Sequence, residues 1–281
     1  MQTIHTVAAL RAALKNQASI AFVPTMGNLH AGHIHLVEIA RQHAECVVVS
    51  IFVNPLQFGP NEDLASYPRT LKADREKLET AGTDIVFAPN TGEMYPETQT
   101  MTITPPPIAS ELCGASRPGH FAGVATIVMK LFNIVFFNGS ARQVAVFGKK
   151  DFQQLFIIKE LVKQFNLPIE IIAGETVREA DGLAMSSRNG YLSAQERASA
   201  TQLNSALQSI VDAIKSGNKS FPALETTAIQ QLCEAGWQVD YIAVRSAKTL
   251  LIPKENERDL VVLAAAKIGT TRLIDNLTIT I

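Results

Sequence analysis

The feature that most constrains the fold is a regular alternation of short apolar runs and longer segments with helical periodicity. Residues 46–53, CVVVSIFV, are almost wholly apolar and rich in valine, as expected of a strand that is covered on both faces. Between the apolar run at 20–23 and this one, apolar residues recur from Ile34 to Ile39 and indicate the start of an amphipathic helix. The order predicts a parallel α/β sheet with helices on both faces. Further strands are expected at 84–89, 144–148 and 169–174, and further helices at 70–81, 124–137 and 151–165.

The pattern changes after about residue 176. The expected elements are then helices near 194–216 and 221–235 and strands at 239–244, 259–268 and 272–281. Strands joined by short turns predict a smaller α+β C-terminal domain with antiparallel strands. We therefore expect two domains, residues 1–176 and 177–281, with a hinge near 175–190.

Composition excludes several classes of protein. The chain of 281 residues is 47% hydrophobic and 18% charged, so it can bury a sizeable core. Its formal net charge of -1 argues against a long polyanion as ligand, and we expect no nucleic-acid partner. The N-terminal stretch MQTIHTVAALRAALKN lacks an uninterrupted apolar region, which predicts a short amphipathic helix rather than a signal peptide.

Two further observations point to the cytoplasm. The apolar segment 124–137 is interrupted by Lys130 and Asn133 and is shorter than the ~20 residues that span a bilayer, so no membrane partner is expected. The 3 cysteines are far apart and outside any CxxC pattern, which predicts neither a disulfide framework nor a zinc site. We therefore expect a cytoplasmic protein.

The loops that follow the expected strands are where a ligand should bind, because ligands of parallel sheets lie at the carboxyl ends of the strands. The loop after residue 23 contains His30, His33 and His35. Zinc-binding helices pair histidines at positions i and i+4 with a nearby carboxylate, and these spacings do not match that pattern. In the simplest interpretation, His30 and His33 only occupy a helix N-terminus. His35 is expected to be an ordinary helix residue.

The position of His30 and His33 nevertheless favours an anion-binding role. A strand, a turn and a helix start would place backbone N–H groups and two imidazoles where a phosphate binds well. Gly27 and Gly32 would permit the close backbone approach that a nucleotide needs. A second element, MSSRN at 185–189, offers two hydroxyls and an arginine, although alone it could be a simple turn. Together the two elements are similar to the paired HIGH and KMSKS elements of nucleotidyl-transferring α/β enzymes.

Longer blocks of the sequence resemble one family. The blocks are FVPTMGNLHAGH (22–33), VSIFVNPLQFGPNEDLASYPRTL (49–71), ASRPGHFAGVATIV (115–128), VFGKKDFQQL (146–155), VREADGLAMSSRNGYLS (177–193) and GTTRLIDN (269–276). They resemble the pantoate–β-alanine ligases, or pantothenate synthetases. The resemblance implies a Rossmann-like ATP- and pantoate-binding domain, a smaller C-terminal lid domain and a homodimer.

The resemblance also implies a reaction. Pantoate carboxylate would attack the α-phosphorus of ATP to give pantoyl adenylate and pyrophosphate, and the amine of β-alanine would then displace AMP to form pantothenate. The small-molecule partners are thus pantoate, β-alanine and ATP, with Mg²⁺ accompanying ATP and no tightly bound organic cofactor. The runner-up is a small-molecule adenylyltransferase without the second ligation step. An alternative of another class is a nucleotide-binding regulatory module that has lost catalysis.

Matching positions in the family assign roles to individual residues. The resemblance implies catalytic roles for His33, His30 and Lys150, with His33 donating a proton or stabilising charge. The ATP-binding residues would be Met26, Gly27, Asn28, Leu29, His30, Ala31, Gly32, His33, Gly148, Lys149, Lys150, Asp151, Val177, Met185, Ser186, Ser187 and Arg188. Pantoate or β-alanine would contact Pro24, Thr25, Met26, Asn54, Gln57 and Gln154.

Three more residues are expected near the site. Asp74 would help to bind the Mg²⁺ that arrives with ATP, although a single aspartate on a charged helix is usually only solvated. Arg117 and His120, in the motif SRPGH, are expected close to the substrates without an assigned role.

Two departures from the family pattern are visible. Lys149 stands where the family has glutamate, in GKKD rather than GEKD, which bears on ATP affinity more than on activity. The segment 136–143 is longer than the usual connection before the next strand, and Gly139–Ser140 is expected to be a tolerated surface insertion.

Overall fold

The computed structural model describes residues 1–60, 62–139 and 142–281. These residues form two compact units. Unit 1 comprises residues from the ranges 1–106, 117–149 and 154–175, and unit 2 comprises 107–116, 150–153 and 176–281. The domain boundaries drawn at 176 and 177 stay a prediction. The insertion expected at Gly139–Ser140 falls partly outside the described residues, which end at 139 and resume at 142.

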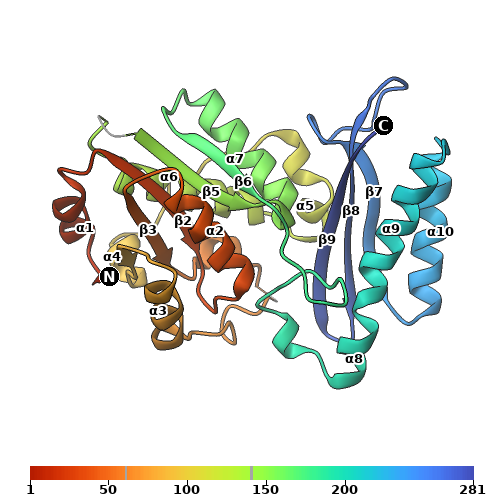
Figure 1. Ribbon diagram of the computed structural model, residues 1–281, viewed down its shortest axis with the longest axis horizontal. Helices are drawn as coiled ribbons and strands as arrows, with labels where there is room; N and C mark the ends of the chain where they lie inside the picture. The colour runs from red at the N-terminus through yellow and green to blue at the C-terminus, as the bar shows by residue number, and fades with distance from the viewer. Residues whose placement is uncertain (61, 140–141) are drawn as a thin grey trace. The chain divides into compact units, whose positions relative to one another are not determined.

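Unit 1 is built on a parallel sheet. Its described strands lie in the order β1-β4-β3-β2-β5-β6, and every neighbouring pair is parallel (Figure 1). The strands are β1 (Gln2–Ile4), β2 (Ser19–Thr25), β3 (Cys46–Ile51), β4 (Ile85–Phe87), β5 (Arg142–Gly148) and β6 (Glu170–Gly174). All except β1 lie where apolar runs predicted strands, so the parallel α/β fold is confirmed.

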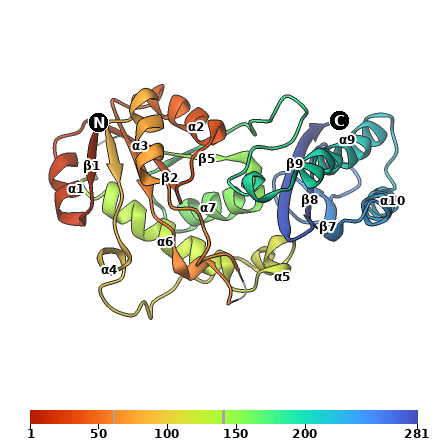
Figure 2. The ribbon, with the colours of Figure 1, turned by 90° about the horizontal axis from the view of Figure 1, so that it is seen from below.

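Helices cover both faces of this sheet. They are α1 (Val7–Leu14), α2 (Ala31–Arg41), α3 (Leu71–Thr80), α4 (Thr91–Met94), α6 (His120–Val135) and α7 (Phe152–Gln164). One buried cluster joins α1, α6 and α7 to strand residues that include Phe22. A second cluster joins α2 and α3 to the strand residues that point to the opposite face of the sheet, among them Ala21 and Val23. Figure 2 shows α2 and α3 on one side of the strands and α6 on the other. Because successive strand residues point to opposite faces, β2 must be apolar on both.

The N-terminal stretch contains the expected short helix and, before it, a short strand. Residues Gln2–Ile4 form β1, which pairs with β4, and the N–H of Gln2 donates to the carbonyl of Asp84 at 2.8 Å. The helix begins only at Val7, where the Thr6 hydroxyl caps it by accepting from the N–H of Ala9 at 3.3 Å. The short helix predicted within residues 1–16 is confirmed as α1, whereas β1 was not predicted because this short edge strand depends on a distant partner.

Unit 2 contains a separate antiparallel sheet. Its strands are β7 (Gln238–Ser246), β8 (Asp259–Ile268) and β9 (Thr271–Thr280), in that order in the sheet. The helices α9 (Thr201–Lys215) and α10 (Phe221–Glu234) contribute buried apolar residues to a common core with these strands. The remaining helices of the unit are the short α5 (Cys113–Ser116) and α8 (Ala194–Ser199). The predicted α+β region with antiparallel strands is confirmed.

One helix of unit 2 is interrupted. The sequence predicts a single helix near 194–216, whereas α8 ends at Ser199 and α9 begins at Thr201. The hydroxyl of Thr201 donates to the carbonyl of Ala198 at 3.3 Å. Threonine side chains compete in this way with the backbone ladder of a helix, which gives the interruption a physical reason.

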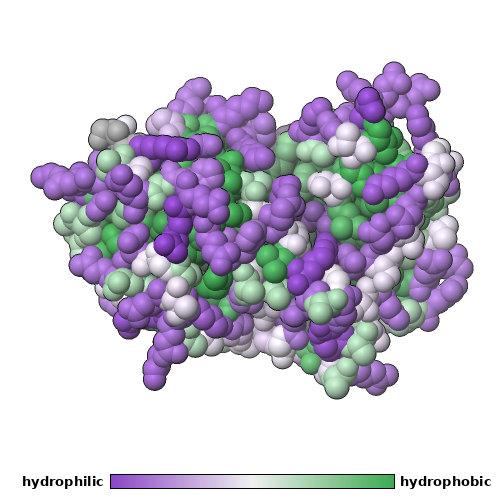
Figure 3. Space-filling model, in the orientation of Figure 1, coloured by the Kyte–Doolittle hydropathy of each residue, from purple (hydrophilic) through white to green (hydrophobic). Residues whose placement is uncertain are grey.

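The face of the molecule drawn in Figure 3 is mostly hydrophilic, with smaller apolar areas between the polar residues. The most apolar helix, α6, has 16 residues, fewer than the ~20 that span a bilayer. No helix within the described ranges combines the length and hydropathy needed to cross a membrane.

The packing of α6 on the sheet generates a stability prediction. Phe132 is 2% exposed, and its ring centroid lies 6.3 Å from that of Phe147 on β5. Replacing Phe132 by alanine leaves a cavity, so we expect the free energy of unfolding of unit 1 to fall by about 3–5 kcal/mol in urea titrations. The matched control is Phe165→Ala, because Phe165 is 55% exposed. Equal losses in the two variants would contradict this description of the core.

Candidate active site

The strand order of unit 1 locates the candidate site. From β2 the chain continues through β3 and β4 in one direction, whereas β5 and β6 extend the sheet in the other. β2 and β5 are neighbours, with Phe22 opposite Ala145. In such sheets ligands bind outside the carboxyl ends of the strands, where the direction of winding reverses. The turns that follow β2, β3 and β5 are therefore the candidate site.

The turn after β2 is held by one buried carboxylate. Gly27 and Asn28 have positive φ angles of 85° and 51°, a conformation that few side chains adopt without strain. Asp74 is 0% exposed; its Oδ1 accepts from the N–H of Leu29 at 2.8 Å and its Oδ2 from that of Asn28 at 2.9 Å. The hydroxyl of Thr70 donates to Oδ2 at 3.0 Å. Asp74 thus fixes the direction in which the chain enters α2.

Two adjacent imidazoles stand at the start of α2, with ring centroids 4.1 Å apart. The N–H of Gly32 donates to Nδ1 of His30 at 3.1 Å, and the N–H of His30 donates to Nδ1 of His33 at 3.3 Å. A ring nitrogen that accepts carries no proton, so this geometry assigns the proton of each neutral ring to Nε2. The helix dipole and two Nε2–H donors together suit a phosphate.

His35 lies apart from this pair. Its Nδ1 is 3.5 Å from Oε2 of Glu38, and its side chain is 38% exposed. Residues two positions apart on a helix do not face each other, which separates His35 from His33. Within the described ranges, no group of three or more histidine, cysteine, aspartate or glutamate side chains is placed to hold a metal ion.

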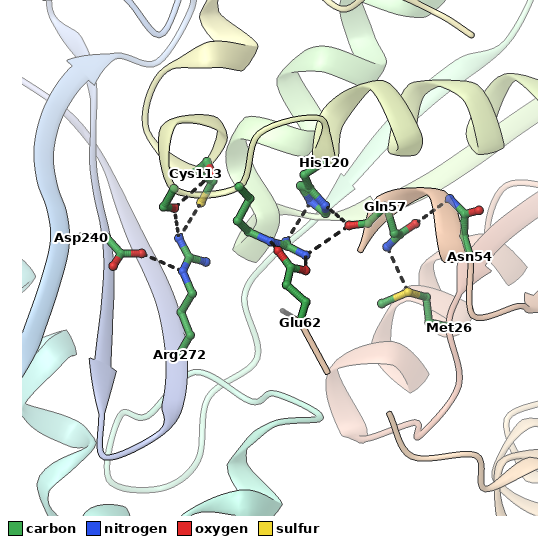
Figure 4. Close-up of polar contacts among 10 residues, drawn as sticks. Met26, Asn54, Gln57, Glu62, Cys113, His120, Asp240 and Arg272 are labelled. Atoms are coloured by element: carbon green, nitrogen blue, oxygen red, sulfur yellow. Dashed lines mark hydrogen bonds and ion pairs between the residues drawn. The ribbon is translucent and has the colours of Figure 1, made fainter. Parts of the chain in front are cut away.

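The turn after β3 presents two amide side chains. Asn54 and Gln57, at the cap and the end of the 3-10 turn η1 (Pro55–Gln57), are 1% and 9% exposed. Asn54 Nδ2 donates to Gln57 Oε1 at 3.2 Å, and Gln57 Nε2 donates to Met26 Sδ at 3.0 Å (Figure 4). The structure therefore brings together three of the residues expected to contact pantoate or β-alanine.

Tyr95 supports this turn and was not identified from the sequence. Its hydroxyl donates to Asn54 Oδ1 at 2.7 Å. Burial raises the pKa of Tyr95 to about 12, so the phenol remains a neutral donor near pH 7. The Nζ of Lys130 lies 4.6 Å from the ring centroid, and burial lowers the pKa of this lysine. No local pattern could have indicated Tyr95, because it lies 41 positions from Asn54 in the chain.

Other expected residues of unit 1 lie at the strand ends. Pro24 and Thr25 close β2 and are half-buried, and the Thr25 hydroxyl donates to the carbonyl of Ser50 at 2.7 Å. Gln154, near the start of α7, is also half-buried. These placements agree with the expected positions at the strand ends.

The lysine that departs from the family pattern has an acidic partner. After β5 the chain forms the 3-10 turn η3 (Lys149–Asp151). Within unit 1, Lys149 Nζ forms an ion pair with Oε1 of Glu175. The extra positive charge at Lys149 is therefore balanced locally.

In unit 2, a buried carboxylate joins several segments. Asp275 on β9 is 4% exposed and accepts from both Nη atoms of Arg178, at 2.7 and 2.9 Å. It also accepts from Asn204 Nδ2 at 3.1 Å. The neighbouring Asn276 donates from Nδ2 to the carbonyl of Lys150 at 2.8 Å. Asp275 and Asn276 thus hold the base of the loop at 178 and the backbone at Lys150.

Hydrogen bonds within the loop hold the backbone of the segment of unit 2 that is expected to bind ATP. The N–H of Met185 donates to the carbonyl of Val177 at 3.0 Å, and the N–H of Arg188 donates to Ser186 Oγ at 3.2 Å. Ser187, like its neighbours, is half-buried. The sequence pattern indicated this loop but not the Arg178–Asp275 pair beneath it. An aspartate inside the apolar pattern RLIDNLTITI was the available signal, since buried charges are paired.

Comparison with known proteins identifies the family. The sequence model for pantoate-beta-alanine ligase matches residues 2–278. The chain belongs to this family. Among curated relatives, the pantothenate synthetase of Methylobacillus flagellatus is 64% identical over 277 residues, covering 99% of this chain and 98% of that protein. That of Thiobacillus denitrificans is 59% identical over 281 residues, covering 100% and 98%.

Solved structures of pantothenate synthetases share the fold. The crystal structure of the enzyme from Thermus thermophilus has a TM-score of 0.92 and 43% identity, and 99% of each chain is covered. The pantoate-beta-alanine ligase of Francisella tularensis, complexed with beta-gamma ATP and beta-alanine, has a TM-score of 0.78 and 33% identity, covering 99% of this chain and 97% of that one. The family resemblance inferred from sequence is confirmed.

Replacing Asp74 by asparagine tests its positioning role in this ligase fold. The new amide nitrogen cannot accept, so the N–H of Asn28 or Leu29 would lose its partner. We expect the free energy of unfolding of the protein without metal or ATP to fall by about 1–3 kcal/mol. The Mg²⁺ dependence of activity should remain that of the unmodified protein.

The control is Asp212→Asn, which alters an exposed carboxylate on α9 that accepts from Gln208, and its stability should hardly change. If Asp74→Asn left the metal-free stability unchanged and raised the Mg²⁺ requirement, Asp74 would be a metal ligand instead.

Proposed function

We propose that this chain condenses pantoate with β-alanine, using ATP, to give pantothenate, AMP and pyrophosphate. Membership of the pantoate–β-alanine ligase family supports this function, as do the names of its relatives. The ligands of the Francisella tularensis ligase, beta-gamma ATP and beta-alanine, are in accord with it. The observation that carries the proposal is the pair of Nε2–H imidazoles at the N-terminus of α2, where the winding of the sheet reverses.

In the first step, an oxygen of the pantoate carboxylate attacks the α-phosphorus of ATP. The bond from that phosphorus to its bridging oxygen breaks, and pyrophosphate leaves with the electron pair. His30 and His33 would donate from Nε2 to phosphate oxygens, at the positive end of the dipole of α2. Donors that are already oriented stabilise the charge that moves onto the leaving group. The step needs no proton transfer, so we assign His33 charge stabilisation first.

In the second step, the amine of β-alanine attacks the acyl carbon of pantoyl adenylate. The bond from that carbon to the AMP oxygen breaks, the amine loses a proton, and the amide forms. A free carboxylate is a poor acylating agent, and adenylation supplies the leaving group. The site must keep water away from this mixed anhydride until the amine arrives.

The pantoate site is proposed around the amides of Gln57 and Gln154, with Asn54 beside them. A primary amide can donate to a carboxylate and accept from a hydroxyl, which suits a hydroxy acid. Neutral amides also have a lower desolvation cost than charged groups. Pro24, Thr25 and Met26, at and after the end of β2, would complete the lining.

The remaining ATP contacts are proposed on other loops. Gly148 and Asp151 would bind the ribose, and Lys150 would meet the phosphates as a compact positive charge. Lys149 would lie beside them with its charge balanced by Glu175. Residues of unit 2 would flank adenine and contact phosphates, namely Val177, Met185, Ser186, Ser187 and Arg188.

Magnesium is proposed to accompany ATP and to be held mainly by phosphate oxygens. Mg²⁺ usually keeps several waters and is bound by one or two carboxylates together with substrate phosphates. Asp74 fits this poorly, because it is fully buried and accepts from two backbone N–H groups and a hydroxyl. We propose that it orients the turn instead.

Assembly and location are proposed from family resemblance alone. We propose a cytoplasmic homodimer in which residues 177–281 act as a lid on residues 1–176. Light scattering should give a mass of twice 30.5 kDa. A monomeric mass at micromolar concentration would contradict the dimer.

A coupled assay separates this ligase from an adenylyltransferase that lacks the second step. AMP, pyrophosphate and pantothenate should form in equal amounts only when pantoate, β-alanine and ATP are all present. Formation of pyrophosphate without pantothenate, at the same rate with and without β-alanine, would favour the adenylyltransferase. No turnover of ATP under any condition would favour a regulatory module.

Replacing His33 by alanine removes one Nε2–H donor from the start of α2. We expect turnover to fall about 100-fold or more, the scale of losing an oriented transition-state donor. His35→Ala is the matched control on the same helix and should keep normal turnover, because His35 faces Glu38. Near-normal turnover of a folded His33→Ala variant, measured by AMP release, would remove His33 from the mechanism.

A further inference from the structure

The backbone carbonyl of Gln57 receives two side-chain donors from the start of α6. His120 Nδ1 lies 2.8 Å from this oxygen (Figure 4). Arg117 Nη2 lies 3.4 Å from the same oxygen. A carbonyl can only accept, so Nδ1 of His120 carries the proton. The neutral ring then accepts at Nε2, where Arg117 Nη1 donates at 3.0 Å. This tautomer is the opposite of that of His30 and His33.

A carboxylate completes the arrangement. Arg117 donates from Nε and Nη2 to the two oxygens of Glu62, at 2.8 and 2.5 Å. Burial acts to raise the pKa of Glu62, but the hydrogen bonds and charge of Arg117 outweigh it and leave the pKa below its usual value. The pair is therefore ionised at neutral pH, and its bidentate geometry fixes the plane of the guanidinium. We call Glu62, Arg117 and His120 the relay.

The relay acts where α6 lies against η1 at very short range. A Cβ atom on Gly123 would come within 2.1 Å of the carbonyl oxygen of Leu56, so only glycine permits this approach. The carbonyl of Gly123 in turn accepts from Asn54 Nδ2 at 3.3 Å. His120 is 9% exposed, so water does not replace its bond to Gln57 freely. The turn that carries Gln57 is thus fixed from one side.

We propose that the relay is a positioning device for pantoate recognition: it holds the backbone of Gln57 so that the side-chain amide is presented in one orientation. This proposal rests on the proposed function, in which Gln57 binds pantoate. It gives Arg117 and His120 of the SRPGH motif a role that does not require contact with substrate. We expect the relay to affect binding of the hydroxy acid rather than the nucleotide. Gln57, on the turn after β3, belongs to the proposed pantoate site, whereas the proposed phosphate donors lie on the turn after β2.

His120 variants test the proposal by comparing two Michaelis constants. His120→Phe keeps a ring but removes both hydrogen bonds. We expect the KM for pantoate to rise about tenfold or more, while the KM for ATP changes less than about twofold. His120→Asn places an amide donor near the position of Nδ1 and should recover most of the pantoate affinity. A general loss of stability would not produce this split or this rescue.

The ion pair of Arg117 with Glu62 gives a second, independent test of the proposal. Arg117→Lys keeps the charge but loses the bidentate bond, so it should raise the KM for pantoate as His120→Phe does. Gln143→Leu is the control. Gln143 lies on β5, away from the turn that carries Gln57; it is also buried, at 5% exposure, and donates to a backbone carbonyl, that of Phe136, at 3.4 Å. It should leave the KM for pantoate unchanged.

These measurements distinguish a failure of the relay proposal from a failure of the proposed function. If the unmodified protein forms no AMP in response to pantoate, the proposed function fails. If it does, and folded His120→Phe has a normal KM for pantoate, the relay proposal fails while the function stands. A parallel rise of the KM for pantoate and ATP would also overturn it, because the relay would then be part of the general fold.

Discussion

The candidate site depends on side-chain acceptors for backbone N–H groups at the start of α2. The first N–H groups of a helix have no partner within it. Here Asp74 takes those of Asn28 and Leu29 just before the helix, and the rings of His30 and His33 take the next ones. The same bonds that cap the helix place both imidazole protons on Nε2. The bonds that cap the helix therefore also orient the donors that we propose for phosphate binding.

Side chains also fix the backbone of the turn after β3, here by donating to a carbonyl. There the carbonyl of Gln57 accepts from His120 and Arg117, and Gly123 leaves room for the approach of α6. Asp275 has a similar part in unit 2, where it pairs with Arg178. Burying a polar or charged group costs free energy unless the group is hydrogen-bonded, so each of these groups restricts the segment to which it is bonded. These buried groups restrict the segments that carry the residues proposed to meet substrate.

Much of this architecture was predictable from sequence. Strands such as 46–53 are recognisable because both of their faces are apolar, and the histidine loop follows a strand end, so the fold and the candidate loops were found. The short β1 was missed because its pairing with β4 is not encoded locally. Asp74 was identified as a candidate, but its buried contacts with residues more than 40 positions away could not be inferred. The partners of Arg117 and His120 also became visible only when Glu62 and Gln57 were placed in space.

The central claim is that the turns after β2 and β3 bind ATP and pantoate respectively. A crystal structure with pantoate and a non-hydrolysable ATP analogue tests it most directly. The account predicts phosphate oxygens within hydrogen-bond distance of Nε2 of His30 and His33, and the pantoate carboxylate or hydroxyl on the amide of Gln57. A triphosphate bound away from the N-terminus of α2, or pantoate out of reach of Gln57, would contradict it.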